Sequence, residues 1–314
     1  MKKHNESVGV SVIIPSYNCE AYIRQTINSI LDQTYRNIEI LVIDDGSTDG
    51  TPDIVEKFGD KVRLIRQKNA GVCAARNLGF RESRGKFVCF MDHDDYWFPE
   101  KISSQVFQMQ ENPVAGVVFN NFKLWHARNG AFPDPSDLTS HIDPRKKENA
   151  LCGWVYHAFL MDCQMLTSTA MFRREVLDIN GVFDESLPYG EDWDLWLRIA
   201  QNTQFIKLSR SMTLYRQHVK QGNRLVRPVD YRTLILERAV KKWGYASRDG
   251  RRIPQDVFEK RLAAYHADFG LHHLREGHFR MATRSLMKAW GLRPAKIKYP
   301  AYLAAGVLGW KPAW

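Results

Sequence analysis

The chain has 314 residues, 44% of them hydrophobic and 25% charged, which predicts a soluble globular protein with one large domain and room for a smaller appendage. Its five cysteines form no C-x-x-C pair, and no apolar run reaches the roughly 18–20 residues of a membrane-spanning helix, so neither a disulfide framework nor a transmembrane segment is expected. The first residues, MKKHNESVG, contain no apolar stretch, so we expect no signal peptide and a cytoplasmic location.

The net charge of +10 is concentrated near the C-terminus. Residues 241–300 contain 14 Lys and Arg against five acids, which accounts for nearly the whole excess. Such a patch suits nucleic acid, anionic lipid or a phosphate-bearing substrate, and a solvated helical face fits it equally well.

The first part of the chain alternates short apolar strands with helices. The expected strands are 10–18, 38–43, 62–65 and 86–91. Asn18 is expected to cap the first helix, and Thr51 to cap a second helix that has proline at its first position and runs to about Phe58. A third helix begins in GVCAARNLGF.

This order is typical of a parallel sheet with right-handed crossovers, in which ligands bind outside the carboxyl ends of the strands. The polar stretches Ser16–Asn18, Asp44–Asp45 and Asp92–Asp94 all follow strands, so they are expected to share that edge.

The regularity is weaker after a strand at 115–119. A long loop is expected over 126–150, followed by a strand at 166–172, a short helix REVLDIN, a helix at 190–200 and a last strand at 212–218. From about residue 230 the sequence is helical, with one helix pair similar to a tetratricopeptide unit.

The stretch FMDHDD places Asp92, Asp94 and Asp95 at the end of a strand. Two aspartates one residue apart suit a hard divalent ion that also binds phosphate oxygens. Helix capping by the same acids is the alternative interpretation.

Four further motifs accompany FMDHDD: VSVIIPSYN, IDDGSTDGT, NAGVCAARNLG and PYGEDWDLWLR. With them the chain resembles the family 2 glycosyltransferases, inverting GT-A enzymes that use nucleotide sugars, over about residues 8–220. The resemblance implies an α/β, Rossmann-like GT-A domain at 1–225 with a mostly parallel sheet. Its nucleotide-sugar half would span about 8–120 and its acceptor half 121–225, before a basic helical extension at 226–314.

The same resemblance implies donor-binding roles. Pro15 and Tyr17 would line the nucleotide pocket, and Asp45 would accept a hydrogen bond from the uracil N–H; a turn or cap is the alternative for Asp45. Arg76 and Asn77 match positions near the donor, where a guanidinium would offset diphosphate charge. A helix-surface arginine is the competing interpretation of Arg76.

Asp94 is the implied metal ligand, for Mn²⁺ or Mg²⁺, and His218 the histidine that completes the metal or diphosphate site. Asp92 and His93 would contact the ribose or diphosphate, although the family commonly has a small residue where this chain has His93. Asp95 is expected to brace the loop.

Asp192 is the implied base that removes the acceptor hydroxyl proton, with Glu191 orienting it or binding acceptor. Gly190 would let the loop approach the sugar closely. The alternative is an acidic helix start favoured by the helix dipole.

The predicted protein is therefore a metal-dependent, inverting glycosyltransferase. It would move one sugar, UDP-linked in our prediction, to a hydroxyl of a glycan or lipid-linked acceptor in cell-surface polysaccharide or lipopolysaccharide assembly. We expect an anionic membrane contact through 241–314 and no nucleic-acid partner, and we leave the oligomeric state open. Two alternatives remain, an inactive nucleotide-sugar-binding regulator and an interaction module acting through the C-terminal helices.

Overall fold

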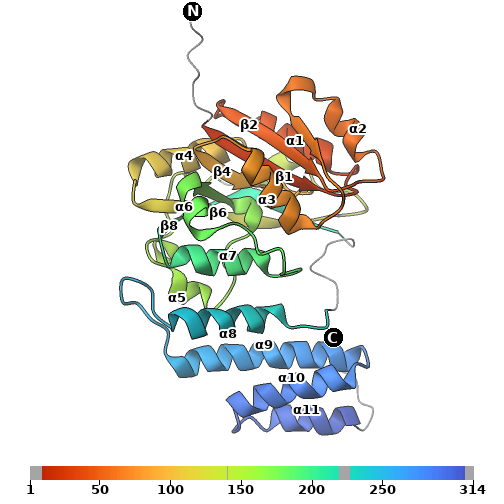
Figure 1. The fold of residues 1–314 in the computed structure, drawn as a ribbon, viewed down its shortest axis with the longest axis vertical. Helices are drawn as coiled ribbons and strands as arrows, with labels where there is room; N and C mark the ends of the chain where they lie inside the picture. Colours follow the sequence, from red (N-terminus) through yellow and green to blue (C-terminus); the bar gives the residue numbers. More distant parts are fainter. Residues whose placement is uncertain (1–8, 140, 219–226, 308–314) are drawn as a thin grey trace, which may run out of the picture. The chain divides into compact units, whose positions relative to one another are not determined.

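The computed structural model describes residues 9–139, 141–218 and 227–307. These residues form two compact units (Figure 1). The first unit holds the described residues up to 155 and from 163 to 218, and the second holds 156–162 together with 227–307. The predicted domain boundary between 225 and 226 lies outside the described residues.

In the described part of the chain, the first unit contains one eight-stranded sheet with the order β3-β2-β1-β4-β7-β6-β8-β5. One half is parallel throughout and comprises β3 (Arg63–Arg66), β2 (Ile38–Asp44), β1 (Val10–Ser16) and β4 (Phe87–Phe90). Every residue of β1 is buried, as expected for a strand inside a sheet that is covered on both faces.

The other half of the sheet is mixed. It comprises β7 (Ala170–Arg173), β6 (Ala115–His126), β8 (Gln204–Gln217) and β5 (Tyr96–Trp97). β7 runs antiparallel to both β4 and β6, β6 and β8 are parallel, and β5 is antiparallel to β8. The predicted mostly parallel α/β sheet is therefore confirmed, with an antiparallel strand joining its two parallel parts.

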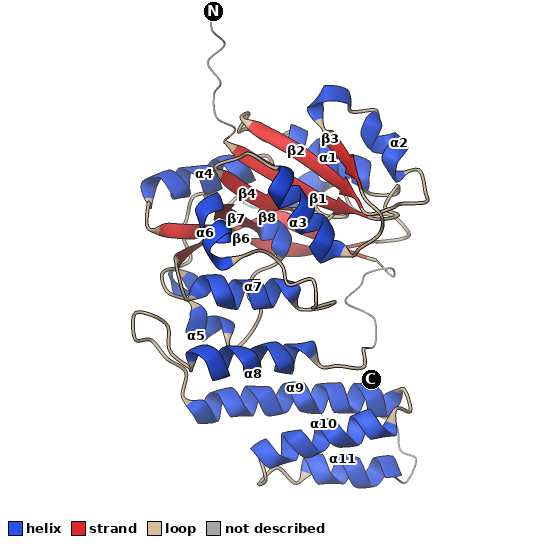
Figure 2. Ribbon diagram, in the orientation of Figure 1, coloured by secondary structure: helices blue, strands red, loops and turns tan. Residues whose placement is uncertain are grey.

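Helices flank this sheet (Figure 2). They are α1 (Ile23–Leu31), α2 (Thr51–Glu56), α3 (Val72–Glu82), α4 (Lys101–Glu111), α6 (Arg174–Asn180) and α7 (Glu191–Ala200). Short 3-10 turns lie at Gly59–Lys61, Pro135–Leu138, Asn149–Leu151 and Thr167–Thr169.

Two predicted helix caps are wrong. α1 begins at Ile23 rather than after Asn18, which has a left-handed backbone (φ 47°) and accepts a hydrogen bond from the Thr48 N–H at 2.8 Å. α2 begins at Thr51 itself and ends at Glu56, and the Thr51 hydroxyl accepts the Cys19 N–H at 2.9 Å. Both side chains cross-link the loops after β1 and β2 instead of capping helices.

Two strands are longer than predicted. β6 continues to His126 and β8 begins at Gln204, because the two strands pair with each other from Ala115–Gln204 to His126–Gln217. The predicted strand at 166–172 is reduced to β7, since a 3-10 turn occupies Thr167–Thr169. β5 had no counterpart in the sequence-based prediction. The alternative interpretation of the acidic cluster, in which Asp94 or Asp95 caps a helix that starts at Pro99, is wrong, because α4 begins at Lys101 with Glu100 at its N-cap position.

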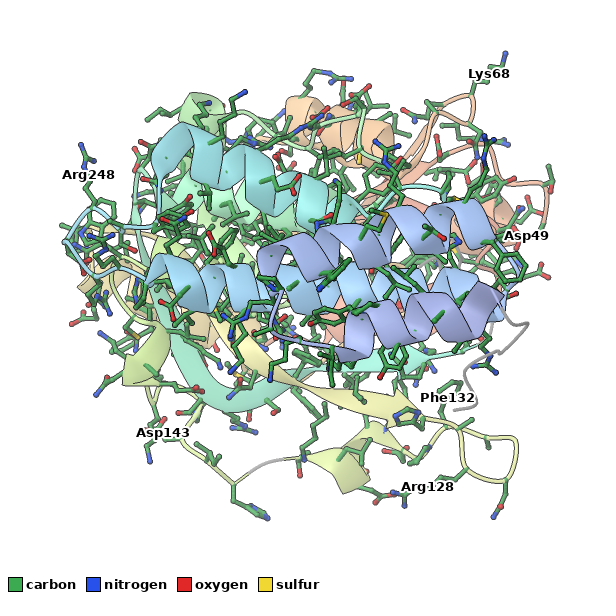
Figure 3. The ribbon with its side chains drawn as sticks, turned by 90° about the horizontal axis from the view of Figure 1, so that it is seen from below. Asp49, Lys68, Arg128, Phe132, Asp143 and Arg248 are labelled. Atoms are coloured by element: carbon green, nitrogen blue, oxygen red, sulfur yellow. The ribbon has the colours of Figure 1, made fainter. Side chains whose placement is uncertain are left out.

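The second unit is helical, as predicted from about residue 230. It contains α5 (Tyr156–Phe159), α8 (Tyr231–Trp243), α9 (Gln255–Arg275), α10 (Phe279–Leu292) and α11 (Lys298–Val307). Figure 3 shows α9, α10 and α11 side by side, and they share their own apolar core. None of the helices in the described ranges combines the length and the hydropathy needed to cross a bilayer. All five cysteines are free thiols, which agrees with the prediction of no disulfide framework.

Close approach of α3 to the sheet yields a stability prediction. A Cβ on Gly79 would lie 2.3 Å from Ile13 Cγ2 and 3.0 Å from Ile43 Cγ1, in the packed interface of α3 with β1 and β2. We expect Gly79→Ala to lower the free energy of unfolding by about 1–3 kcal/mol, because overpacking outweighs the gain in helix propensity. Urea denaturation measures the change.

Gly291→Ala is the matched control, because Gly291 also lies in a helix and a Cβ there would meet nothing within 4 Å. It should leave stability unchanged or raise it slightly. Equal effects of the two substitutions would contradict the close-packing explanation.

Candidate active site

The acidic turn after β4 is held in place by hydroxyl groups from other segments. The Asp92 N–H donates to Ser168 Oγ at 3.0 Å. The Thr26 hydroxyl on α1 lies 2.9 Å from the His93 carbonyl and 2.8 Å from the Asp95 carbonyl. The turn therefore has a defined conformation at the carboxyl end of its strand.

Arg76 on α3 links this turn to the start of α7. Its guanidinium lies 2.7 Å from Asp92 Oδ1 and 2.8 Å from Glu191 Oε1, and the residue is only 4% exposed. Burial by itself would lower the pKa of Arg76, but the two carboxylates outweigh it and raise that pKa. The ring of Phe183 lies against the same guanidinium, at 4.9 Å. A helix-surface position for Arg76 is excluded, because the residue is buried.

Contacts before and within α7 hold its first turn in place. Gly190, the residue before it, has a left-handed backbone (φ 77°) that favours glycine. Further along, the Trp196 ring stacks on Phe172 with centroids 5.2 Å apart, and its indole N–H donates to the Met165 carbonyl at 3.0 Å. The first-turn acids therefore belong to a rigid helix.

Asp192, in that first turn, has an unusual acidity. Burial and the neighbouring Glu191 carboxylate raise the pKa of Asp192 to about 7, although the charge of Arg76 acts in the opposite direction. Its Oδ1 accepts the Trp193 N–H at 2.7 Å. A carboxyl group that titrates near neutral pH suits general-base chemistry.

Asp94 and His218 meet at the other side of the acidic turn. Asp94 Oδ2 and His218 Nε2 are 2.8 Å apart, and the Tyr22 ring lies 4.9 Å from the imidazole. Burial raises the pKa of Asp94, but the hydrogen bond with His218 and the charges of His93 and His218 outweigh it and hold that pKa below its ordinary value. The two residues predicted as metal ligands are thus brought together from segments 124 positions apart.

Arg216, two residues before His218, was not singled out from the sequence. Its Nε donates to the Asp94 carbonyl at 2.7 Å and its backbone N–H to Asp95 Oδ1 at 3.2 Å. The guanidinium is buried among aromatic rings, 3.9 Å from Trp125 and 4.6 Å from Phe132. Its only sequence signal was its place in LYRQH, within the predicted last strand and two residues before the predicted histidine.

Asp95 is the most deeply buried acid of the turn, at 1% exposure. Burial and the charges of Asp94 and Asp92 raise its pKa well above the ordinary value. Its bond to the Arg216 N–H fits the predicted role in bracing the loop.

His93 is explained by the strand beside it. Its Nδ1 lies 3.2 Å from the Pro15 carbonyl, so the imidazole connects the turn after β4 to the end of β1. Tyr17, two residues after Pro15, is 47% exposed, which leaves its ring accessible for stacking. Pro15, near the end of β1, therefore lies next to the acidic turn.

Asp45 holds the loop between β3 and α3. Its Oδ1 accepts hydrogen bonds from Gln67 Nε2 at 2.6 Å and the Ala70 N–H at 2.8 Å, and its Oδ2 accepts the Gly71 N–H at 2.9 Å. In the same loop the Lys68 side chain points outward (Figure 3). Oδ2 accepts only one of these bonds, which leaves it a lone pair that could accept the uracil N–H. Uracil recognition by Asp45 stays a prediction.

Both polar atoms of the Asn77 side-chain amide form hydrogen bonds within the protein. Its Nδ2 donates to the Phe183 carbonyl at 2.9 Å and to Glu185 Oε1 at 2.8 Å, and its Oδ1 accepts the Phe183 N–H at 3.1 Å. These bonds fix the loop before α7. A direct donor contact by Asn77 stays a prediction, and the observed geometry gives it a positioning task.

The metal-coordinating side chains of the site would bind Mn²⁺ or Mg²⁺ only together with ligands from phosphate or water. Among the residues that the structure describes, no group of three or more His, Cys, Asp and Glu side chains is arranged for a metal. The adjacent Asp94 carboxylate and His218 imidazole offer two protein ligands, which fits an ion that takes its remaining ligands from phosphate and water.

Comparisons with known proteins bear on the family. The family model described as Glycosyl transferase family 2 matches residues 11–178. The Escherichia coli protein WfaP, named UDP-Glc:alpha-D-GlcNAc-diphosphoundecaprenol beta-1,3-glucosyltransferase, is 36% identical over 67% of this chain and 77% of its own length. An uncharacterized glycosyltransferase of Rickettsia typhi is 33% identical over 64% of this chain, which spans only 61% of that relative.

Solved structures bear on the fold. S. aureus TarS 1–349 in complex with UDP-GlcNAc has a TM-score of 0.65 at 20% identity and covers 90% of this chain and 81% of its own. GalNAc-T7 with UDP, GalNAc and Mn²⁺ has a TM-score of 0.54 at 15% identity and covers 76% of this chain and 48% of its own. The expected GT-A fold is confirmed.

The buried Arg76 provides a prediction for stability. Replacing it with methionine would leave Asp92 and Glu191 without their cation, so we expect Arg76→Met to lower the free energy of unfolding by about 3 kcal/mol. Because Arg76 also lowers the pKa of Asp192, that pKa should rise in the variant. Urea denaturation and a pH titration of the Asp192 carboxyl by NMR measure the two effects.

Arg81→Met, at the exposed end of the same helix, is the control and should change stability by about 0.5 kcal/mol or less. If both variants unfolded alike, Arg76 would not be the buried link described above.

Proposed function

The chain belongs to glycosyl transferase family 2, and we propose that it is an inverting enzyme that transfers a single sugar from a UDP-sugar to a hydroxyl group. The observation that carries this proposal is the ion-pair network of Arg76, which joins the turn holding Asp92 to the helix start holding Asp192. Donor-binding and proton-accepting groups would thereby act on the same sugar.

The proposed reaction assigns one proton and one bond to named groups. The acceptor hydroxyl oxygen attacks the anomeric carbon as the bond from that carbon to the diphosphate breaks. The Asp192 carboxylate takes the hydroxyl proton, and its pKa of about 7 makes it a stronger base than an ordinary aspartate while leaving about half of it ionised at neutral pH. Attack from the face opposite the diphosphate inverts the anomeric configuration.

Donor binding is assigned to residues around the acidic turn. Tyr17 would stack on the base and Asp45 would accept its imide N–H, while Asp92 and His93 would contact the ribose or diphosphate. A divalent cation held by Asp94 and His218 would offset the charge of the departing nucleoside diphosphate. The ligands of similar folds, UDP-GlcNAc and UDP in TarS and UDP with Mn²⁺ in GalNAc-T7, support a UDP-linked donor and a divalent cation.

The proposed acceptor is a lipid-linked glycan in cell-surface polysaccharide assembly. The name of the Escherichia coli relative specifies a GlcNAc-diphosphoundecaprenol acceptor and a UDP-linked glucose donor. An acceptor of that class lies in a membrane, so we also propose a cytoplasmic protein that contacts the membrane peripherally.

Removing the base should abolish transfer without removing donor binding. We expect Asp192→Asn to lower kcat by at least about 1,000-fold, because the amide cannot accept the proton. UDP binding should be unchanged. Asp194→Asn is the matched control on the same helix, since Asp194 pairs with Arg198 at 2.8 Å, and it should remain active.

The role of Asp192 as a base also predicts the direction in which kcat changes with pH. Protonated Asp192 cannot act as a base, so kcat should rise as pH increases through about 7 and then level off.

The same pKa predicts how stability depends on pH. Because the pKa of Asp192 is higher in the folded state, its protonation stabilises the folded state at low pH, and this contribution to the free energy of unfolding is lost as pH rises from the ordinary pKa of 3.8 through about 7. Asp192→Asn should therefore gain stability relative to the parent over that range. A flat profile, or an active Asp192→Asn, would refute the assignment.

Donor and metal binding can be tested without an acceptor. UDP with Mn²⁺ should raise the melting temperature by about 5 °C at saturation, and neither alone should do so fully. Asp94→Asn should lose most of the Mn²⁺-dependent part, whereas Asp60→Asn, at an exposed carboxylate, should keep it. Stabilisation by UDP that is indifferent to Mn²⁺ would remove the metal from the proposal.

A further inference from the structure

The helix α10 has one buried face and one exposed face in the described part of the chain, and on the exposed face the Trp290 indole N–H donates to the Pro294 carbonyl at 3.1 Å. Ala282, Ser285, Leu286 and Ala289, spaced three or four residues apart, pack inward with α9 and α11. The contact with α9 is close, because a Cβ on Gly270 would lie 2.8 Å from Leu286 Cγ. The inward face of α10 is therefore fully used, and its opposite face points away from the core.

Two parallel rows of side chains cover that opposite face. Arg280, Arg284 and Lys288 form one row at four-residue spacing and are exposed. Phe279, Met287 and Trp290 lie beside them and are 46%, 55% and 40% exposed. We call these six residues the α10 outer face.

The region around this face contains cations and no acid of its own. From residue 279 to 298 the sequence contains six Lys and Arg and no acid. Within the described ranges none of the six forms an ion pair, although Lys288 lowers the pKa of Glu237 on α8 through its charge, after the larger effect of the Glu237–His266 hydrogen bond. Just beyond the helix, Ile297 is 81% exposed.

Folding alone does not account for this pattern. Four large apolar side chains in water beside a row of cations cost free energy in the isolated unit. The combination is typical of a helix that lies in a membrane interface, where cations meet anionic headgroups and aromatic or aliphatic side chains enter the acyl boundary.

We propose that the α10 outer face docks on an anionic lipid membrane. A second copy of the chain is a poor occupant, because two such faces would bring their cations together. Nucleic acid would match the charge but would leave Met287 and Ile297 without a partner. The inference rests on the proposed function in one respect: a lipid-linked acceptor lies in a membrane that the enzyme must reach.

Vesicle flotation of the full chain tests the proposal. Binding to phosphatidylcholine vesicles with about 30% phosphatidylglycerol, at roughly 0.05 M salt, should exceed binding to phosphatidylcholine alone and weaken at about 0.5 M salt. Arg280→Glu, Arg284→Glu and Lys288→Glu together should weaken partitioning by at least roughly a hundredfold, about fivefold for each cation removed.

A charge-matched control separates the face from net charge. Lys57→Glu, Lys61→Glu and Arg81→Glu together change the net charge equally, at exposed positions of the first unit, and should bind vesicles almost as the parent does. Met287→Ser with Ile297→Ser keeps every cation and should bind at low salt but release at lower salt than the parent. Circular dichroism of each variant verifies folding.

Three outcomes would overturn the proposal: equal binding to neutral vesicles, undiminished binding by the α10 charge-reversal variant, or equal loss in the control variant. Binding of single-stranded RNA without binding of anionic vesicles would also overturn it, in favour of a nucleic-acid surface. The assay contains no sugar donor, so its failure leaves UDP binding and transfer to be judged by their own tests.

Discussion

The guanidinium of Arg76 is the constraint on which the site depends. Carboxylates on two sides stabilise a buried cation, and a cation stabilises a cluster of acids by offsetting its repulsion. Arg76 meets both needs at once, with Asp92 on one side and Glu191 on the other. It thereby fixes the distance between the turn after β4 and the first turn of α7, and its charge moderates the acidity of Asp192.

A second cation organises the opposite side of the acidic turn. Arg216 is enclosed by aromatic rings and donates to the backbone of Asp94, while its own N–H reaches Asp95. Because Arg216 lies in β8 and His218 directly follows it, this strand positions both the carbonyl contact and the imidazole that meets Asp94. The three acids of the turn thus have different partners: Asp92 pairs with Arg76, Asp94 pairs with His218, and Asp95 is buried against β8.

The second unit has a different physical character. Its core of small and aliphatic side chains uses one face of each packed helix, and the α10 outer face combines cations with exposed apolar groups. This contrast supports the two proposed roles, which are sugar transfer in the first unit and membrane contact in the second. Each unit can be tested by itself, because UDP binding and vesicle binding use separate residues.

The resemblance to a known family indicated the candidate residues of the site. The sequence by itself determined the succession of strands and helices in the parallel half and the helical character of the second unit. Local hydrophobic periodicity and turn residues encode those features, and the order of the motifs indicated the family. Tertiary structure alone decided the rest, because it depends on contacts between distant segments. Pairing across the sheet extended β6 and β8, and cross-loop bonds diverted Asn18 and Thr51 from capping. Arg76 meets Glu191 across 115 positions, and no local pattern reports such a meeting or the desolvation that brings the pKa of Asp192 near neutrality.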